Sequence, residues 1–189
     1  MKLTLAKSAG FCYGVRRAVE LADSTAKAGT PCVILGSIVH NMDVVRHLAQ
    51  QGLRSVEHVD DVPGDGSVII RSHGVTKAVQ EQLEATGAEV VDATCPFVKR
   101  IHSIVSREEE KGRLPVIIGT PTHPEVEGIA GWCSNCLIFE NPEELENWIK
   151  TENPAPETPL CMVSQTTSTE FLWKMCGEIA KKQFTNLKI

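Results

Sequence analysis

The chain repeats the spacing of a cysteine, a glycine and a histidine, and this repeat constrains its fold more than any other feature. Each of these residues in the first copy has a counterpart 83 positions later. A fixed spacing of this kind is typical of a duplicated structural unit. We therefore expect two similar units, residues 1–94 and 95–189, that each deliver a thiol and an imidazole to a shared site. The pairs are Cys12 and Cys95, Gly36 and Gly119, and His40 and His123.

Short apolar runs alternate with segments of helical periodicity in both copies. The runs predict buried strands, and apolar residues recurring every three or four positions predict helices. Strands that alternate with helices at these lengths predict three-layer α/β/α units with short parallel sheets. The expected strands are 1–6, 32–35, 68–71, 89–93, 115–118, 160–163 and the start of another at 186–189; the expected helices are 15–28, 43–51, 77–86, 96–111, 142–150 and 169–183.

Composition excludes several classes of protein. A chain of 189 residues that is 42% hydrophobic can bury two small cores. Its formal net charge of −5, without any block of Lys or Arg, argues against nucleic acid as the main partner. The N-terminus does not resemble a secretory signal, and no apolar run is long enough to cross a bilayer. We expect a cytoplasmic protein that does not contact the membrane.

Cysteine usage favours free thiols or metal ligands over disulfides, because seven cysteines without a secretory signal make a poor disulfide framework. Cys12 and Cys95 each lie between a predicted strand and the helix that follows it. Open α/β sheets bind ligands there, and the helix dipole favours negative charge. A thiolate at such a position can bind iron or attack an electrophile. Either cysteine alone is better explained as a half-buried thiol, but their shared repeat position favours a site.

The other five cysteines carry a weaker signal. Cys32, Cys161 and Cys176 lie in or beside apolar segments, where cysteine behaves as a small buried hydrophobe. Cys133 and Cys136 form a C-x-x-C motif, which fits half of a zinc site or a redox pair. No second C-x-x-C accompanies it. An incidental pair of loop thiols is therefore the favoured interpretation.

Three histidines, His40, His73 and His123, each follow a predicted strand. Imidazoles placed at the carboxyl ends of strands can bind zinc, or can donate hydrogen bonds to a phosphate. Glu125 is two residues beyond His123 and is a candidate proton donor or relay, although a surface charge is a plausible alternative. Thr166 follows the strand 160–163 and either offers its hydroxyl to the same cavity or caps the next helix. The remaining histidines, His47, His58 and His102, are interpreted as surface or helix residues.

Five motifs occur in order along the chain, and Ser164-Gln165-Thr166-Thr167 follows them. Together they resemble the 4-hydroxy-3-methylbut-2-enyl diphosphate reductases, iron–sulfur enzymes of the methylerythritol phosphate route to isoprenoids. The resemblance covers all 189 residues and corresponds to the N-terminal two thirds of that family. The motifs are Ala9 to Ala18, Val39-His40-Asn41, Ser72-His73-Gly74-Val75, Asp92-Ala93-Thr94-Cys95-Pro96 and His123 to Gly128.

The resemblance implies α/β units arranged about a pseudo-threefold axis around a [4Fe–4S] cluster, with the third unit missing from this chain. It implies that Cys12 and Cys95 are cluster ligands. It further implies that Glu125 supplies a proton and that Thr166 lines the pocket. The residues implied to surround the substrate diphosphate are His40, His73 and His123.

The implied reaction is the reductive dehydroxylation of 4-hydroxy-3-methylbut-2-enyl diphosphate to isopentenyl and dimethylallyl diphosphates. Ferredoxin or flavodoxin would donate the electrons one at a time. Because each unit of the family supplies one cysteine, we expect a truncated form with impaired activity. Two alternatives stay open: a non-catalytic two-unit metal-binding scaffold, and a hydrolase with a zinc ion bound by histidines.

Overall fold

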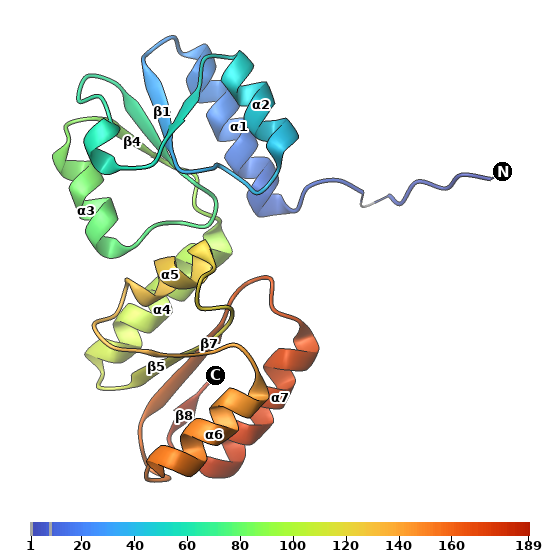
Figure 1. The fold of residues 1–189 in the computed structure, drawn as a ribbon, viewed down its shortest axis with the longest axis vertical. Helices are drawn as coiled ribbons and strands as arrows, with labels where there is room; N and C mark the ends of the chain where they lie inside the picture. Colours follow the sequence, from blue (N-terminus) through green and yellow to red (C-terminus); the bar gives the residue numbers. More distant parts are fainter. Residues whose placement is uncertain (1, 8) are drawn as a thin grey trace. The chain divides into compact units, whose positions relative to one another are not determined.

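A computed structural model describes residues 2–7 and 9–189 and contains two four-stranded parallel sheets (Figure 1). The first compact unit comprises residues 1–72 and 83–96, and the second comprises residues 73–82 and 97–189. Both combine a parallel sheet with helices, which confirms the repeated α/β units expected from the sequence. The proposed repeat boundary between residues 94 and 95 stays a prediction.

The sheet of the first unit has the strand order β2-β1-β3-β4, and every neighbouring pair is parallel. The mostly buried strands β1 and β3 occupy its centre, and the short, partly exposed β2 occupies an edge. Helices α1 and α2 pack on one face of this sheet, and α3 begins in the second unit and ends in the first. The elements are α1 (Tyr13–Lys27), β1 (Cys32–Leu35), α2 (Met42–Gln50), β2 (Arg54–Val56), the 3-10 turn η1 (Val59–Asp61), β3 (Ser67–Ile70), α3 (Lys77–Ala85) and β4 (Glu89–Asp92).

The second unit repeats this order as β6-β5-β7-β8, again all parallel. Helices α4 and α5 cover one face of the sheet, where Val105 and Ile129 pack on Ile117. Helices α6 and α7 cover the other face, where Leu145 and Cys176 are buried. The elements are α4 (Pro96–Glu110), β5 (Leu114–Ile118), α5 (Pro124–Ala130), β6 (Leu137–Phe139), α6 (Pro142–Glu152), β7 (Leu160–Ser164), α7 (Glu170–Gln183) and β8 (Leu187–Lys188).

In both sheets, the second and third strands along the chain lie on opposite sides of the first. The chain adds β2 on one side of β1 and then β3 on the other, and it does the same with β6 and β7 around β5. Loops at the carboxyl ends of such strand pairs diverge and leave room for ligands. Gly36 and Gly119 directly follow β1 and β5, so the repeated glycines mark the two positions where an open α/β sheet binds its ligands.

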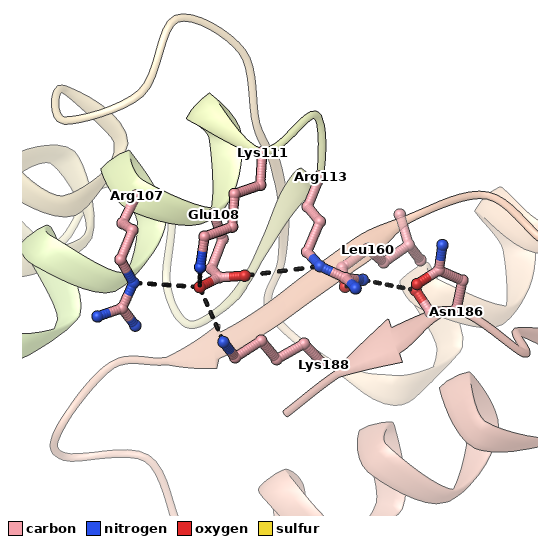
Figure 2. A network of polar contacts seen from close by, with 7 residues as sticks. All are labelled: Arg107, Glu108, Lys111, Arg113, Leu160, Asn186 and Lys188. Carbon is pink, nitrogen blue, oxygen red and sulfur yellow. Dashed lines mark hydrogen bonds and ion pairs between the residues drawn. The ribbon is translucent and has the colours of Figure 1, made fainter.

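The edge strand β8 of the second sheet is tied to helix α4 through one buried carboxylate, that of Glu108 (Figure 2). Lys188 of β8 approaches it to 2.8 Å and Lys111 to 3.1 Å. Arg107 and Arg113 lie 3.2 and 3.5 Å from its oxygens. These cations hold the pKa of Glu108 at about 2, below its ordinary 4.5, through hydrogen bonds from Lys188 first and Lys111 second. The network therefore ties the last strand to α4.

Four elements and one histidine differ from the sequence-based expectation. The strand expected at residues 1–6 is absent from the described residues 2–6, whose Leu3 and Leu5 are exposed. Strands β2 and β6 and helix α5 were not expected. His102 lies in a helix as expected but is buried rather than at the surface. Within the described residues, no helix combines the length and apolar character needed to cross a membrane.

Candidate active site

Backbone hydrogen bonds join the loops that follow β1, β3 and β4 in the first unit. The amide of Ser72 donates to the carbonyl of Ile38 at 3.1 Å. The carbonyl of Ser72 in turn accepts from the amide of Cys95 at 2.9 Å. The loop that carries Cys95 is therefore fixed against its neighbours at the carboxyl edge of the sheet.

Cys12 and Cys95 both lie at helix N-termini, as the sequence predicts. Cys12 is the exposed N-cap residue of α1, and Cys95 immediately precedes α4. The thiol of Cys95 packs so closely on Gly14 that a Cβ atom there would lie 2.6 Å from its Sγ. Glycine at position 14 thus lets the first turn of α1 approach the second cysteine.

Arg17 fixes this arrangement from within α1. Its guanidinium donates to the carbonyl oxygens of Thr94 at 3.2 Å and Asp92 at 3.3 Å. Neither α1 nor α4 has an acidic residue in its first turn. Both cysteines therefore lie where helix dipoles, unopposed by first-turn carboxylates, favour a negative charge.

His40 lies at the exposed end of the loop after β1 in the first unit. The next residue, Asn41, is the N-cap of α2, and its side chain accepts from the amides of Asp43 at 3.0 Å and Val44 at 3.2 Å. The cap begins α2 directly after His40, which leaves the imidazole at the boundary between loop and helix.

In the second unit the structure brings Glu125 and Thr166 into direct contact. Glu125 lies in the first turn of α5 after β5, and Thr166 follows the adjacent strand β7. The Thr166 amide donates to Oε1 of Glu125 at 2.5 Å, and its hydroxyl donates to Oε2 at 2.8 Å. Glu125 is only 2% exposed whereas Thr166 is exposed. Glu125 is therefore not the surface charge that the sequence left open, but a buried acid joined to an accessible hydroxyl.

The rings of His73 and His123 lie next to each other in the same unit, with centroids 5.8 Å apart and planes at 87°. His123 is the N-cap of α5, and its Nδ1 accepts from the amide of Glu125 at 3.1 Å. A neutral imidazole that accepts at Nδ1 carries its proton on Nε2. His123 is thus held as a hydrogen-bond donor beside Glu125.

Gly119 allows these loops to meet. A Cβ atom at this position would lie 2.8 Å from Val126 and 2.9 Å from the Cβ of Gln165. The Gln165 side chain accepts from the amide of Thr120 at 3.2 Å and donates to the hydroxyl of Thr167 at 2.7 Å. The backbone carrying Thr166 is therefore braced on both sides.

An open cavity of about 630 Å³ lies on the Thr166 side of this cluster. Its wall combines aromatic and aliphatic side chains with polar groups, which suits a small ligand. The lining comes from α4, the loop after β7 and the start of α7, and includes Phe97, Arg100, Ile104, Thr166 and Trp173.

The structure therefore divides the expected residues between its two units. Cys12, His40 and Cys95 belong to the first; the second brings together the other four, namely His73, His123, Glu125 and Thr166. Sequence reasoning missed Gly14 and Arg17, which position Cys95. The glycine and arginine of the first motif were visible, but no spacing rule connects them to a loop some eighty residues away.

The class of protein follows from comparison with known families and structures. The LytB protein family matches residues 3–189, and the chain belongs to this family.

Curated relatives of the chain are named 4-hydroxy-3-methylbut-2-enyl diphosphate reductase. That of Clostridioides difficile is 40% identical over 88% of this chain and 59% of its own length. That of Caldanaerobacter subterraneus is 39% identical over 99% of this chain and 65% of its own length. The chain thus spans less than two thirds of these relatives.

Solved structures agree with this relationship. The E-1-hydroxy-2-methyl-but-2-enyl-4-diphosphate reductase of Plasmodium falciparum superposes with a TM-score of 0.88 at 28% identity, covering 96% of this chain and 57% of the other. A second structure is that of an (E)-4-hydroxy-3-methyl-but-2-enyl diphosphate reductase, the terminal enzyme of the non-mevalonate pathway. It superposes with a TM-score of 0.83 at 32% identity, covering 98% of this chain and 66% of the other.

Proposed function

We propose that this chain carries the substrate-binding and proton-transfer groups of a 4-hydroxy-3-methylbut-2-enyl diphosphate reductase. The reaction breaks the C–O bond of the substrate, takes up a pair of electrons and two protons, and releases water with isopentenyl or dimethylallyl diphosphate. The observation that carries the proposal is the buried Glu125 carboxylate joined to the exposed Thr166 hydroxyl beside two histidines.

Glu125 and Thr166 suit the transfer of a proton to a departing hydroxyl. Oε1 of Glu125 faces an amide, which can only donate, so an added proton belongs on Oε2. The hydroxyl of Thr166 can accept that proton while it donates its own to a ligand. The buried acid would thus act on the substrate through an accessible group.

The histidines suit the diphosphate. His123 presents a donor at Nε2 because its Nδ1 accepts from a backbone amide, and His73 lies beside it. We assign these two residues to the substrate diphosphate, and the same role for His40 of the first unit stays a prediction from the sequence. Hydrogen bonds to a charged phosphate contribute about 1.5–3 kcal/mol each.

An iron–sulfur cluster fits the chain only in part. Cys12 and Cys95 offer the thiolate donors that [4Fe–4S] clusters use, and we propose them as two of its ligands. Among the described residues, however, no three Cys, His, Asp or Glu side chains gather to bind a metal ion. The two thiolates alone do not complete the ligand set, which usually has four cysteines. Bound together with further ligands, the cluster would supply the electrons, received from ferredoxin or flavodoxin.

The alternative zinc hydrolase is distinguished from the reductase by metal content, because it would bind zinc through His40, His73 and His123 and would lack iron and sulfide. The metal-binding scaffold is distinguished from the reductase by substrate binding. A scaffold has no reason to bind an isoprenoid diphosphate, whereas the reductase requires it.

Calorimetric titration with 4-hydroxy-3-methylbut-2-enyl diphosphate, and separately with inorganic pyrophosphate, tests the proposal. We expect the chain to bind both, and His73→Ala and His123→Ala to weaken each affinity by about tenfold or more. His58→Ala removes an exposed histidine elsewhere and should leave both affinities unchanged. No binding by the wild type, or equal binding by all variants, would overturn the assignment.

A further inference from the structure

The loop between α5 and β6 holds two thiols that the proposed reaction does not use. Cys133 and Cys136 lie on either side of a bend, and both are free and half-buried. The Cys133 thiol donates to the carbonyl of Ala130 at 3.4 Å, and both cysteines pack against the apolar cluster that contains Val105, Ile117 and Ile129. Cysteines three residues apart in a tight bend are close enough to bridge when their side chains meet.

Glu109 of α4 holds this bend in place. Its carboxylate accepts from the amide of Ser134 at 2.7 Å and from the amide of Asn135 at 3.0 Å. These are the two residues between the cysteines. The two residues between the cysteines are therefore held in the bend, which lowers the conformational entropy that the loop would lose on closing a disulfide across it.

The two thiols differ in acidity. The hydrogen bond from Cys133 lowers the pKa of Cys136 to about 7, below its ordinary value of 9. The same hydrogen bond, burial and the nearby Glu109 raise the pKa of Cys133. Burial raises the pKa of Cys32 and Cys176 to about 11. At neutral pH Cys136 is thus the better attacking thiolate of these four.

Trp132, which directly precedes Cys133, connects the two cysteines to the segment that follows His73. The indole of Trp132 donates to the carbonyl of Val75 at 2.9 Å and stacks on the ring of His102 with centroids 5.1 Å apart. The carbonyl of Gly131 accepts from the amide of Lys77 at 3.3 Å. The residues next to the bend are therefore hydrogen-bonded to the segment that follows His73.

We propose that Cys133 and Cys136 form a redox-active dithiol that low-molecular-weight disulfides oxidise reversibly to an intramolecular disulfide. The Cys136 thiolate attacks one sulfur of the oxidant, whose other sulfur leaves as a thiolate. Cys133 then attacks Sγ of Cys136, expels the second thiolate and loses its proton. The products are one protein disulfide and two reduced small thiols, and excess dithiol reverses both steps.

Peptide mapping after treatment of the whole chain with oxidised glutathione tests the proposal. Trypsin releases residues 114–150 as one peptide, in which Cys133 and Cys136 are the only cysteines. We expect this peptide to become two hydrogen atoms lighter and to recover its mass with dithiothreitol. Cys136 should react on the order of a hundredfold faster than the thiols of pKa about 11.

Single substitutions distinguish Cys136, which attacks the oxidant, from Cys133, which closes the disulfide. Cys133→Ser should stop at a stable glutathione adduct on Cys136, whereas Cys136→Ser should react slowly. Cys32→Ser, which removes a half-buried thiol elsewhere, should leave the reaction unchanged. A peptide that keeps its mass, or that carries glutathione on either cysteine of the wild type without closing, would overturn the proposal.

Tryptophan fluorescence tests the connection to the His73 segment. The chain has three tryptophans, so the signal of Trp132 is obtained by comparison with Trp132→Phe. We expect disulfide formation to change the emission of the wild type and to leave that of Trp132→Phe unchanged. An identical change in both proteins would show that oxidation does not act through Trp132.

Discussion

Thr166 donates two hydrogen bonds to Glu125, although 41 residues separate them in the sequence. The two residues meet because they follow the adjacent strands β7 and β5. One comes from the backbone and the other from the side chain, so the side-chain bond can be removed while the first remains. The pair lies where the second sheet reverses its direction of growth. This position makes Thr166 a link between a buried acid and the surface.

Replacing Thr166 by valine should destabilise the second unit. Valine keeps the shape of the side chain but leaves Oε2 of the buried Glu125 without the hydroxyl, which costs about 1–3 kcal/mol. Urea unfolding measures the difference. Thr166→Ser keeps the hydroxyl and should stay close to wild type. Equal stability of the valine and serine variants would contradict the structural importance of this bond.

The central strands were predictable because a parallel sheet is covered on both faces, so that its inner strands are continuous apolar runs. Strands β1 and β5 are unbroken apolar runs that end at glycine, and both were expected within one residue of their bounds. Edge strands β2 and β6 have three residues each: β2 is mostly polar, and β6 is apolar but too short to be distinguished from a loop. Helix α5 was missed because its seven residues are too few to show helical periodicity, although proline and two glutamates in its first turn are typical of a helix start.

The candidate site was predictable as a set of residues but not as a geometry. Each residue except Cys12 follows a strand, and the parallel strands of a sheet bring their carboxyl ends to one edge. Which side chains touch depends on strand order, and no local pattern encodes it. The extended segment at residues 2–6 shows the same limit, since alternation favours a strand while pairing requires a neighbour.

Gly14→Ala should disturb Cys95. Alanine is ordinarily better than glycine within a helix by about 1 kcal/mol, but here its Cβ would meet the Cys95 thiol at 2.6 Å. We expect no gain in stability and a changed rate of alkylation of Cys95. Gly177→Ala on α7 meets only ordinary contacts at 3.7 Å and should gain about 1 kcal/mol. A similar gain in both variants would show that the thiol moves aside freely.

Arg17→Met should loosen the loop before α4. Methionine keeps the length of the side chain but removes the donors to the carbonyls of Thr94 and Asp92. Hydrogen exchange should become faster at the amide of Cys95, which depends on the position of this loop. Arg16→Met is the matched control, because Arg16 contacts only the exposed carbonyl of Phe11 at 3.4 Å among the hydrogen bonds described for its side chain. Unchanged hydrogen exchange in Arg17→Met would mean that the backbone hydrogen bonds alone hold the loop before α4 in place.

Glu108→Gln should remove a pH-dependent part of the stability. The folded pKa of about 2 lies below the ordinary value of 4.5, so the carboxylate stabilises the fold fully above pH 4.5. That contribution falls as pH decreases from 4.5 and is lost as pH passes through about 2. Wild type and variant should therefore differ most near neutral pH and converge on acidification.

Urea unfolding of both proteins over this pH range gives the comparison, and Glu110→Gln on the exposed side of α4 serves as the control. Lys188→Met should reproduce part of the effect, because Lys188 is the largest cause of the lowered pKa and anchors β8. Hydrogen exchange should then increase at the amide of Leu160, which donates to Asn186 just before β8. A stability difference between wild type and Glu108→Gln that stays constant with pH would mean that the four cations do not stabilise the charged form.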